Sequence, residues 1–113
     1  MDQEFHIEER RGAVAPVIAV RGEVDVATAP QLREHLQRVI ADGSSTVVLD
    51  LLGVTFLDST ALGVVVGAHK RCRELGGELR VVVADPRLVK IFEITGLTGV
   101  LTITDSLHAA GVS

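Results

Sequence analysis

Short apolar runs rich in β-branched residues alternate along this chain with segments that have a helical hydrophobic period. The runs predict four strands, and a weaker pattern at the beginning of the chain predicts a fifth. The expected strands cover residues 5–9, 14–20, 46–52, 79–84 and 100–104. The middle runs are apolar on both faces, which is typical of strands buried inside a sheet.

The segments between the strands predict helices. After Thr28, apolar residues recur at i, i+4, i+7 and i+8, namely Leu32, Leu36, Val39 and Ile40. Thr28 and Gln31 have the spacing of a capping box at the start of this helix. Similar patterns predict helices at about 59–75 and 86–95, and a short one at 105–110. Asp85 and Pro86 form a typical N-cap and first-turn pair.

Glycines that follow the first three helical segments are expected to end them in the left-handed conformation; they are Gly43, Gly76 and Gly96. The resulting order is β-β-α-β-α-β-α-β-α. Such alternation predicts an α/β fold with a mostly parallel sheet of four to five strands and about four helices. A length of 113 residues fits one domain, so we expect residues 1–113 to fold as a single unit.

Charge and composition narrow the classes of function. Fifteen acidic and eleven basic residues give a net charge of −4, which disfavours nucleic acids and anionic membranes as partners. The longest apolar stretch, residues 61–68, is much shorter than the roughly 20 residues that a membrane span needs. The first residues lack the apolar core of a signal peptide, and the lone Cys72 has no disulfide partner. We therefore expect a soluble, cytoplasmic protein.

The turn after the strand at 46–52 contains three consecutive polar residues, Asp58, Ser59 and Thr60, which are the main candidates for a functional site. Asp58 is a good N-cap, so Ser59 and Thr60 are expected in the first turn of a helix, where backbone N–H groups are free and the dipole is positive. By the local sequence alone, these residues are a helix cap. A phosphate on Ser59 would nevertheless be tolerated there, and its charge of about −1.5 to −2 would be felt by any protein that covers the turn.

Several segments resemble the STAS domain of bacterial anti-sigma factor antagonists. The stretch LDSTALG, the later stretch ELGGELRVVVADPRLVKIFEITGL and the earlier segment GEVDVATAPQLREHL are all similar to that family. The resemblance covers nearly the whole chain and implies a STAS-like fold. One position departs from it, because Ala61 stands where the family commonly has glycine.

The resemblance also implies a function. Ser59 would be phosphorylated by an anti-sigma factor that is a serine kinase, and Asp25, Asp58, Ser59 and Thr60 would contact that partner. The unphosphorylated protein would bind the anti-sigma factor and free its sigma factor, and a serine phosphatase would reverse the modification. ATP and magnesium would belong to the kinase, so we expect no cofactor, no metal and no catalysis here, and a monomer when the protein is free.

Other interpretations were weighed against this one. Asp25 is expected either to pair with a cation of the partner or to serve only as a turn acid. Leu57 and Ala61 replace the glycines that a serine hydrolase needs beside its nucleophile, and the four histidines, His6, His35, His69 and His108, lack metal-binding spacing and are expected at the surface. A STAS scaffold or partner-docking module that works without phosphorylation is the remaining alternative.

The helix at 59–75 suggests two further expectations. Gly63 and Gly67 do not form a phosphate-binding loop, so we expect them to allow close packing of the helix against the sheet. Four basic residues near the end of the same helix are expected on a solvated face; they are His69, Lys70, Arg71 and Arg73.

Overall fold

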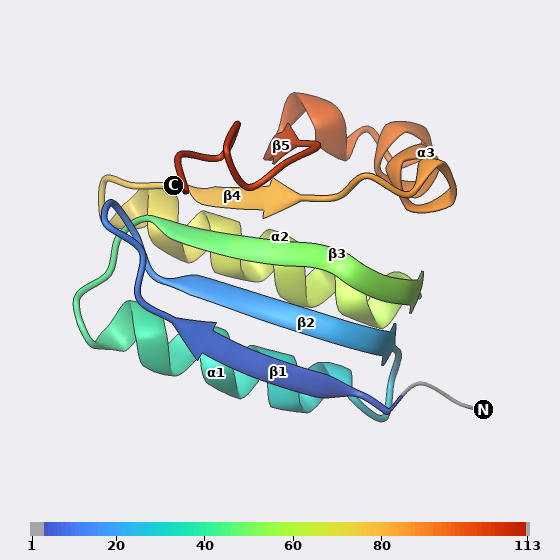
Figure 1. The fold of residues 1–113 in the computed structure, drawn as a ribbon, viewed down its shortest axis with the longest axis horizontal. Coiled ribbons are helices and arrows are strands. Elements are labelled where there is room, and N and C mark those ends of the chain that lie inside the picture. Colours follow the sequence, from blue (N-terminus) through green and yellow to red (C-terminus); the bar gives the residue numbers. More distant parts are fainter. Residues whose placement is uncertain (1–3, 113) are drawn as a thin grey trace.

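The computed structural model describes residues 4–112, which contain a five-stranded sheet in the order β1-β2-β3-β4-β5. The strands are β1 (His6–Arg10), β2 (Val17–Val24), β3 (Val47–Leu57), β4 (Leu79–Val82) and β5 (Thr102–Thr104). Strand β1 pairs with β2 in the antiparallel sense, and all other pairs are parallel. The predicted mostly parallel α/β sheet is therefore confirmed (Figure 1).

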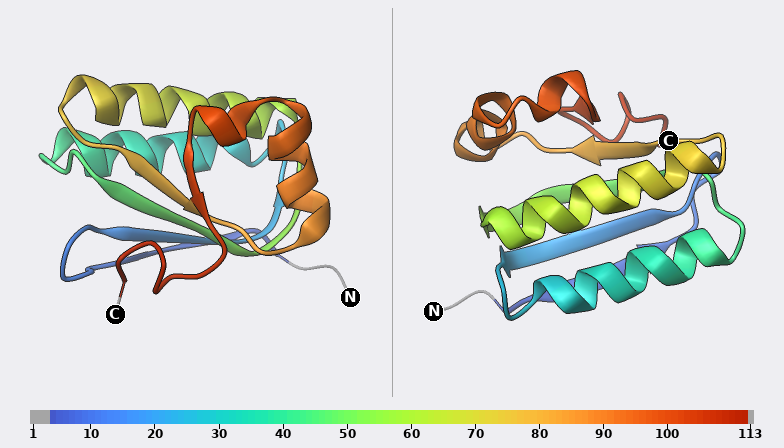
Figure 2. Two further views of the ribbon diagram at one scale, coloured as in Figure 1. Left: turned by 90° about the horizontal axis from the view of Figure 1, so that it is seen from above. Right: turned by 180° about the vertical axis from the view of Figure 1, so that it is seen from behind.

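Two long helices cover one face of this sheet. Helices α1 (Ala29–Ala41) and α2 (Ser59–Glu74) lie side by side on it, and α3 (Pro86–Ile94) lies at the end of the sheet beside β4 (Figure 2). A short 3-10 helix, η1 (Leu97–Gly99), follows α3. The three α-helices begin within a residue of their predicted starts, and Gly43, Gly76 and Gly96 have the expected positive φ.

The main core lies between the sheet and these helices. Phe92 is its largest fully buried side chain, and the rest is built mainly from Val, Leu and Ile. A smaller apolar cluster on the opposite face joins Val17, Val48 and Val82 to Ala110 near the end of the described chain. The segment after β5 thus covers part of the second face of the sheet (Figure 2).

That segment differs from its prediction, because residues 105–110 form turns and not a helix. Ala110 is buried against the strands, and its carbonyl oxygen accepts a hydrogen bond of 3.0 Å from the Arg80 guanidinium. Short helices are marginal in water, so contacts with the sheet decide the conformation of so short a segment.

Strand limits also differ, most clearly in β2 and β3. The apolar run of β2 ends at Val20, but Arg21 and Gly22 continue the ladder by pairing with Gly53 and Val54 of β3. Both strands therefore extend several residues beyond the apolar runs that predict them. This extension carries their ends to the edge of the sheet where α1 and α2 begin.

Helix α2 contains two departures from expectation. His69 is buried and not at the surface, and its Nδ1 accepts a hydrogen bond of 3.3 Å from the backbone N–H of Leu79. Gly63 and Gly67 are exposed, and a Cβ at either position would have no neighbour within 4 Å. The glycines therefore do not serve close packing against the sheet, and the expected basic cluster is reduced to Lys70, Arg71 and Arg73.

Candidate functional site

The ends of β2 and β3 bring the predicted site residues to one edge of the sheet. Val24 and Leu57 are paired as the last residues of the two strands, and the backbone N–H of Asp58 donates a 3.2 Å hydrogen bond to the carbonyl of Val24. The loop that begins at Asp25 and the turn that begins at Asp58 therefore leave the sheet side by side. Ligand sites of open α/β sheets form at such strand ends.

Asp58 is the N-cap of α2, as the sequence predicts. Its backbone is extended, and its Oδ1 accepts a hydrogen bond of 3.0 Å from the N–H of Ala61. The carbonyl of Asp58 accepts the first helical hydrogen bond, from Leu62. Ser59 is therefore the first residue of the helix, at the positive end of its dipole.

The hydroxyl of Ser59 is accessible. Ser59 is exposed and Thr60 is half-buried, and within residues 4–112 the Ser59 side chain has no hydrogen-bond partner. A shallow cavity of about 380 Å³ adjoins Ser59, between α2 and the end of α3, with Leu62, Thr95 and Leu97 among its lining residues. A modifying enzyme can reach this hydroxyl without opening the fold.

Ala61, which replaces the usual glycine, does not face this surface. It is fully buried and belongs to the main core. Its methyl group therefore packs inside the domain, and does not obstruct a protein that approaches Ser59.

Asp25 organises the neighbouring loop. Its Oδ1 accepts hydrogen bonds from the N–H groups of Ala27, at 2.9 Å, and Thr28, at 3.1 Å. Its own N–H donates to Oγ1 of Thr28 at 2.9 Å. The role of Asp25 as a turn acid is thus present in the structure.

The predicted capping box of α1 is wrong. The hydroxyl of Thr28 lies 2.9 Å from the carbonyl oxygen of Glu23 and forms no side-chain cap for the helix. Reciprocal hydrogen bonds with Asp25 occupy the threonine side chain, and Pro30 lies in the first turn of the helix, directly after Ala29. The loop is therefore fixed by contacts within itself.

The electrostatic field of the site has two opposing parts. The helix dipole and the free N–H groups of the first turn favour an anion at Ser59. Residues 25–28 and 53–60 contain two aspartates, Asp25 and Asp58, and neither lysine nor arginine. Within these two segments a phosphate on Ser59 would therefore meet backbone N–H groups and two carboxylates, and the cation that lines the adjoining cavity is Lys70, about three turns further along α2.

Exposed apolar side chains near the site were not found from the sequence. Val26, in the Asp25 loop, is 71% exposed, and Phe56, two residues before Asp58, is 46% exposed. Valine and phenylalanine are usually buried, so the residue types do not indicate this exposure. Only the position of these two residues, beyond or at the end of a strand, could have indicated it. Each of them offers an exposed apolar side chain close in sequence to a predicted site residue.

Residues 4–112 were expected to hold no metal site, and their side chains can be compared with that expectation. No group of three or more His, Cys, Asp or Glu side chains within residues 4–112 is arranged to hold a metal ion. Cys72 is fully buried, and burial raises the pKa of its thiol. Among the helices that the structure describes, none combines the length and apolar character needed to cross a membrane.

Comparison with known proteins identifies the family. The STAS domain model matches residues 4–110. The anti-sigma-B factor antagonist of Listeria monocytogenes is 41% identical over 86 residues, which are 76% of this chain and 75% of that protein. The crystal structure of an anti-sigma factor antagonist from Mycobacterium paratuberculosis superposes with a TM-score of 0.89 and 26% identity, covering 97% of this chain and 95% of that one.

A second solved structure shares the fold at lower identity. The Bacillus cell fate determinant SpoIIAA in its phosphorylated form has a TM-score of 0.68 and 22% identity, and the alignment covers 96% of this chain and 97% of that one. Since the family model spans nearly the whole chain and a relative of high identity covers three quarters of it, this protein belongs to the STAS domain family.

Proposed function

We propose that this protein is an anti-sigma factor antagonist, which binds an anti-sigma factor and thereby frees a sigma factor. The relatives named as antagonists support this proposal, and so does the accessible surface around Ser59. The protein acts by binding and not by catalysis. It works in the cytoplasm, and it is a monomer until it meets its partner.

Phosphorylation of Ser59 is the switch in this proposal. The observation that carries it is the exposed Ser59 hydroxyl at the first position of α2, directly after the capping Asp58. The anti-sigma factor is itself the serine kinase, and it supplies ATP and magnesium. A serine phosphatase removes the phosphate and restores binding. SpoIIAA, which shares the fold, has been solved in a phosphorylated form.

The charge of the phosphate explains why binding would be lost. A partner that covers the site contacts Asp25, Asp58, Ser59 and Thr60, and it would bury the phosphate next to two carboxylates. Residues 25–28 and 53–60 contain no lysine or arginine to compensate it. An unpaired buried charge costs several kcal/mol, and about 1.4 kcal/mol changes affinity tenfold. One modification is therefore sufficient to release the partner.

The test is incubation with purified candidate anti-sigma factor kinases and ATP, followed by mapping of the phosphate by mass spectrometry. The wild type should carry one phosphate, on Ser59. The Ser59→Ala variant should bind the kinase but accept no phosphate, and Ser59→Asp should bind at least tenfold more weakly while its circular dichroism spectrum stays unchanged. Ser44→Ala, at the far end of β3, is the matched control and should behave as the wild type.

Two results would contradict the proposal. Stoichiometric labelling of Ser59→Ala would show that another residue is the modified one. Tight binding of a kinase that never labels Ser59, with Ser59→Asp binding as well as the wild type, would instead identify a scaffold module that works without phosphorylation.

A further inference from the structure

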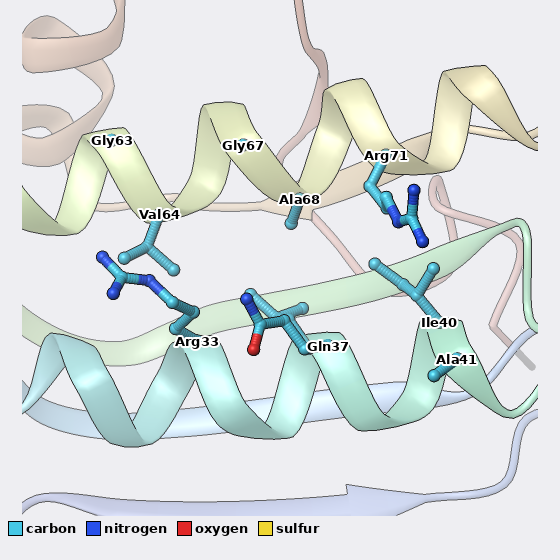
Figure 3. A pocket seen from close by; sticks show the side chains of 10 residues that line it. Arg33, Gln37, Ile40, Ala41, Gly63, Val64, Gly67, Ala68 and Arg71 are labelled. Carbon is cyan, nitrogen blue, oxygen red and sulfur yellow. The ribbon is translucent and has the colours of Figure 1, made fainter.

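The outer side of the helical layer has a groove between α1 and α2. It encloses about 520 Å³, and its floor is formed by Leu36 and Ile40 of α1 with Val64 and Ala68 of α2. Figure 3 shows Ile40 pointing from α1 toward α2, and Val64 and Ala68 pointing from α2 toward α1. The groove faces away from the sheet, so its surface is not needed to pack the helices against the strands.

Gly63 and Gly67 form a notch in the wall of this groove. They lie one turn apart on α2, both line the groove, and a Cβ at either one would have no neighbour within 4 Å. Glycine inside a helix destabilises it by about 0.5–1 kcal/mol relative to alanine. The fold gains no packing contact in return, and the bare backbone remains open to a side chain of another molecule.

Two arginines border the groove from opposite helices. Arg33 extends from α1 toward Val64, and Arg71 extends from α2 toward Ile40 (Figure 3). The side chain of Arg33 has no hydrogen bond or ion pair within residues 4–112, and Arg71 has only a 3.6 Å contact with the exposed Glu74. No acidic side chain lines the groove in the described structure. It therefore offers two positive charges around an apolar floor, and in the described part of the chain only Arg71 of the two has an acidic neighbour.

The shape of the groove suits a helix. Its lining runs over residues 33–41 of α1 and 63–71 of α2, and the first and last of nine helical residues lie about 12 Å apart along the axis. This length corresponds to about two turns of a third helix. An apolar side chain of that helix would enter the hole beside Gly63 and Gly67, as a knob does in helix packing.

We propose that the groove between α1 and α2 docks an acidic amphipathic helix of a partner protein, with its apolar face on the floor and its carboxylates at Arg33 and Arg71. A second copy of this chain does not fit, because α1, α2 and α3 each contain a single acidic residue. Ser59 does not line the groove, although Gly63 and Gly67 also line the shallow cavity beside Ser59. The proposal goes beyond the phosphorylation switch, and the Ser59→Asp variant below separates the two surfaces.

A designed peptide tests this site directly. The probe is a fluorescent peptide of about 15 residues, long enough for marginal helicity, with leucines along one face and glutamates flanking them. The matched probe has lysines in place of the glutamates. The acidic peptide should bind, in fluorescence anisotropy, at least about tenfold more tightly than the lysine peptide, and its affinity should fall as salt is added. Amide chemical shifts should change along residues 33–41 and 63–71.

Variants of the chain complete the test. Arg33→Gln with Arg71→Gln should weaken binding about tenfold, as expected for two exposed ion pairs, while Arg73→Gln, on the same helix, should not. Gly67→Leu should abolish binding because its side chain occupies the notch, although nothing in the fold obstructs it. Ser59→Asp should change the affinity less than about twofold.

Three outcomes would overturn the proposal. The first is equal binding of the acidic and lysine peptides, and the second is unchanged binding by Gly67→Leu. The third is loss of binding in Ser59→Asp, which would place the peptide over the phosphorylation surface. None of these outcomes changes the result expected for phosphorylation of Ser59. The docking proposal and the phosphorylation proposal can therefore fail independently.

Discussion

The backbone N–H of Asp58 donates a hydrogen bond of 3.2 Å to the carbonyl of Val24. This contact joins the end of β3 to the end of β2 at the point where both strands turn into their helices. Asp58 is at the same time the side-chain cap of α2. One residue therefore fixes both the start of the helix that presents Ser59 and its distance from the Asp25 loop.

Asp58→Ala should show how much the side-chain cap contributes to stability and to the phosphorylation of Ser59. The backbone contact with Val24 remains, but the cap on Ala61 is lost, so the free energy of unfolding should fall by about 1 kcal/mol. The first turn of α2 should fray, and the rate of Ser59 phosphorylation should fall with it. Urea unfolding and a phosphorylation time course measure the two effects.

Asp85→Ala is the matched control, because Asp85 caps α3 through a 2.9 Å hydrogen bond from the N–H of Arg87. It should lose a similar amount of stability and keep the wild-type rate of phosphorylation. Equal loss of phosphorylation in both variants would show that stability, and not the local position of Ser59, sets the rate.

Two substitutions at Asp25 distinguish its contribution to the loop from a contribution to binding. Asp25→Asn keeps an oxygen that accepts from Ala27 and Thr28, so stability should change by less than about 0.5 kcal/mol. Asp25→Ala removes that acceptor and should cost about 1 kcal/mol. If Asp25 also pairs with a cation of the anti-sigma factor, Asp25→Asn should weaken binding several-fold in isothermal titration calorimetry. Wild-type affinity for Asp25→Asn would restrict the residue to its role in the turn.

The sequence predicts those features of the fold that local chemistry determines. Asp58 and Asp85 are N-caps as predicted, because a carboxylate directly before a helical period can accept a hydrogen bond from a free N–H of the first turn. Gly43 and Gly96 end their helices because a positive φ is accessible to glycine at little cost. The exposed Ser59 follows from its position in the first turn.

Features that depend on tertiary neighbours could not be predicted in the same way. Thr28 has the spacing of a capping box, but Asp25 and Glu23 compete for its hydroxyl and prevail. His69 is at a helical position next to basic residues, yet the N–H of Leu79 gives it a buried partner. The groove that Gly63 and Gly67 border exists only because α1 and α2 are neighbours in space, which no local pattern reveals.

Alanine substitutions at Gly77 and Gly67 should change the stability of the protein in opposite directions. A Cβ at Gly77 would lie 1.9 Å from the carbonyl oxygen of Ser45, a backbone atom that cannot move away easily. Gly77→Ala should therefore destabilise the protein by about 2–3 kcal/mol, the scale of overpacking. Gly67→Ala, which meets nothing within 4 Å in the middle of α2, should stabilise it by about 0.5–1 kcal/mol. Thermal unfolding of the pair should give shifts of opposite sign, and a stable Gly77→Ala would contradict the close approach of the two chain segments.

Glu78 should make stability depend on pH in the acidic range. A hydrogen bond from the Thr102 hydroxyl, at 2.7 Å, and another from Arg80, at 2.9 Å, hold the pKa of Glu78 below its ordinary value of 4.5. The unfolded chain retains that ordinary value. The stabilisation is therefore complete above pH 4.5 and is lost as the pH falls through the lower pKa of the folded state.

Glu78→Gln should have a lower free energy of unfolding than the wild type at neutral pH. On acidification, this free energy should fall less in the variant than in the wild type. Urea unfolding at a series of pH values from neutral to acidic measures both effects. The curve of the variant should approach that of the wild type at low pH, because the wild-type carboxyl is protonated there in both states and the ionised interaction no longer contributes. Glu93→Gln is the control, since the exposed Glu93 side chain has no hydrogen bond or ion pair within residues 4–112. A Glu78→Gln curve that runs parallel to the wild type at all pH values would show that Thr102 and Arg80 do not stabilise the ionised carboxylate.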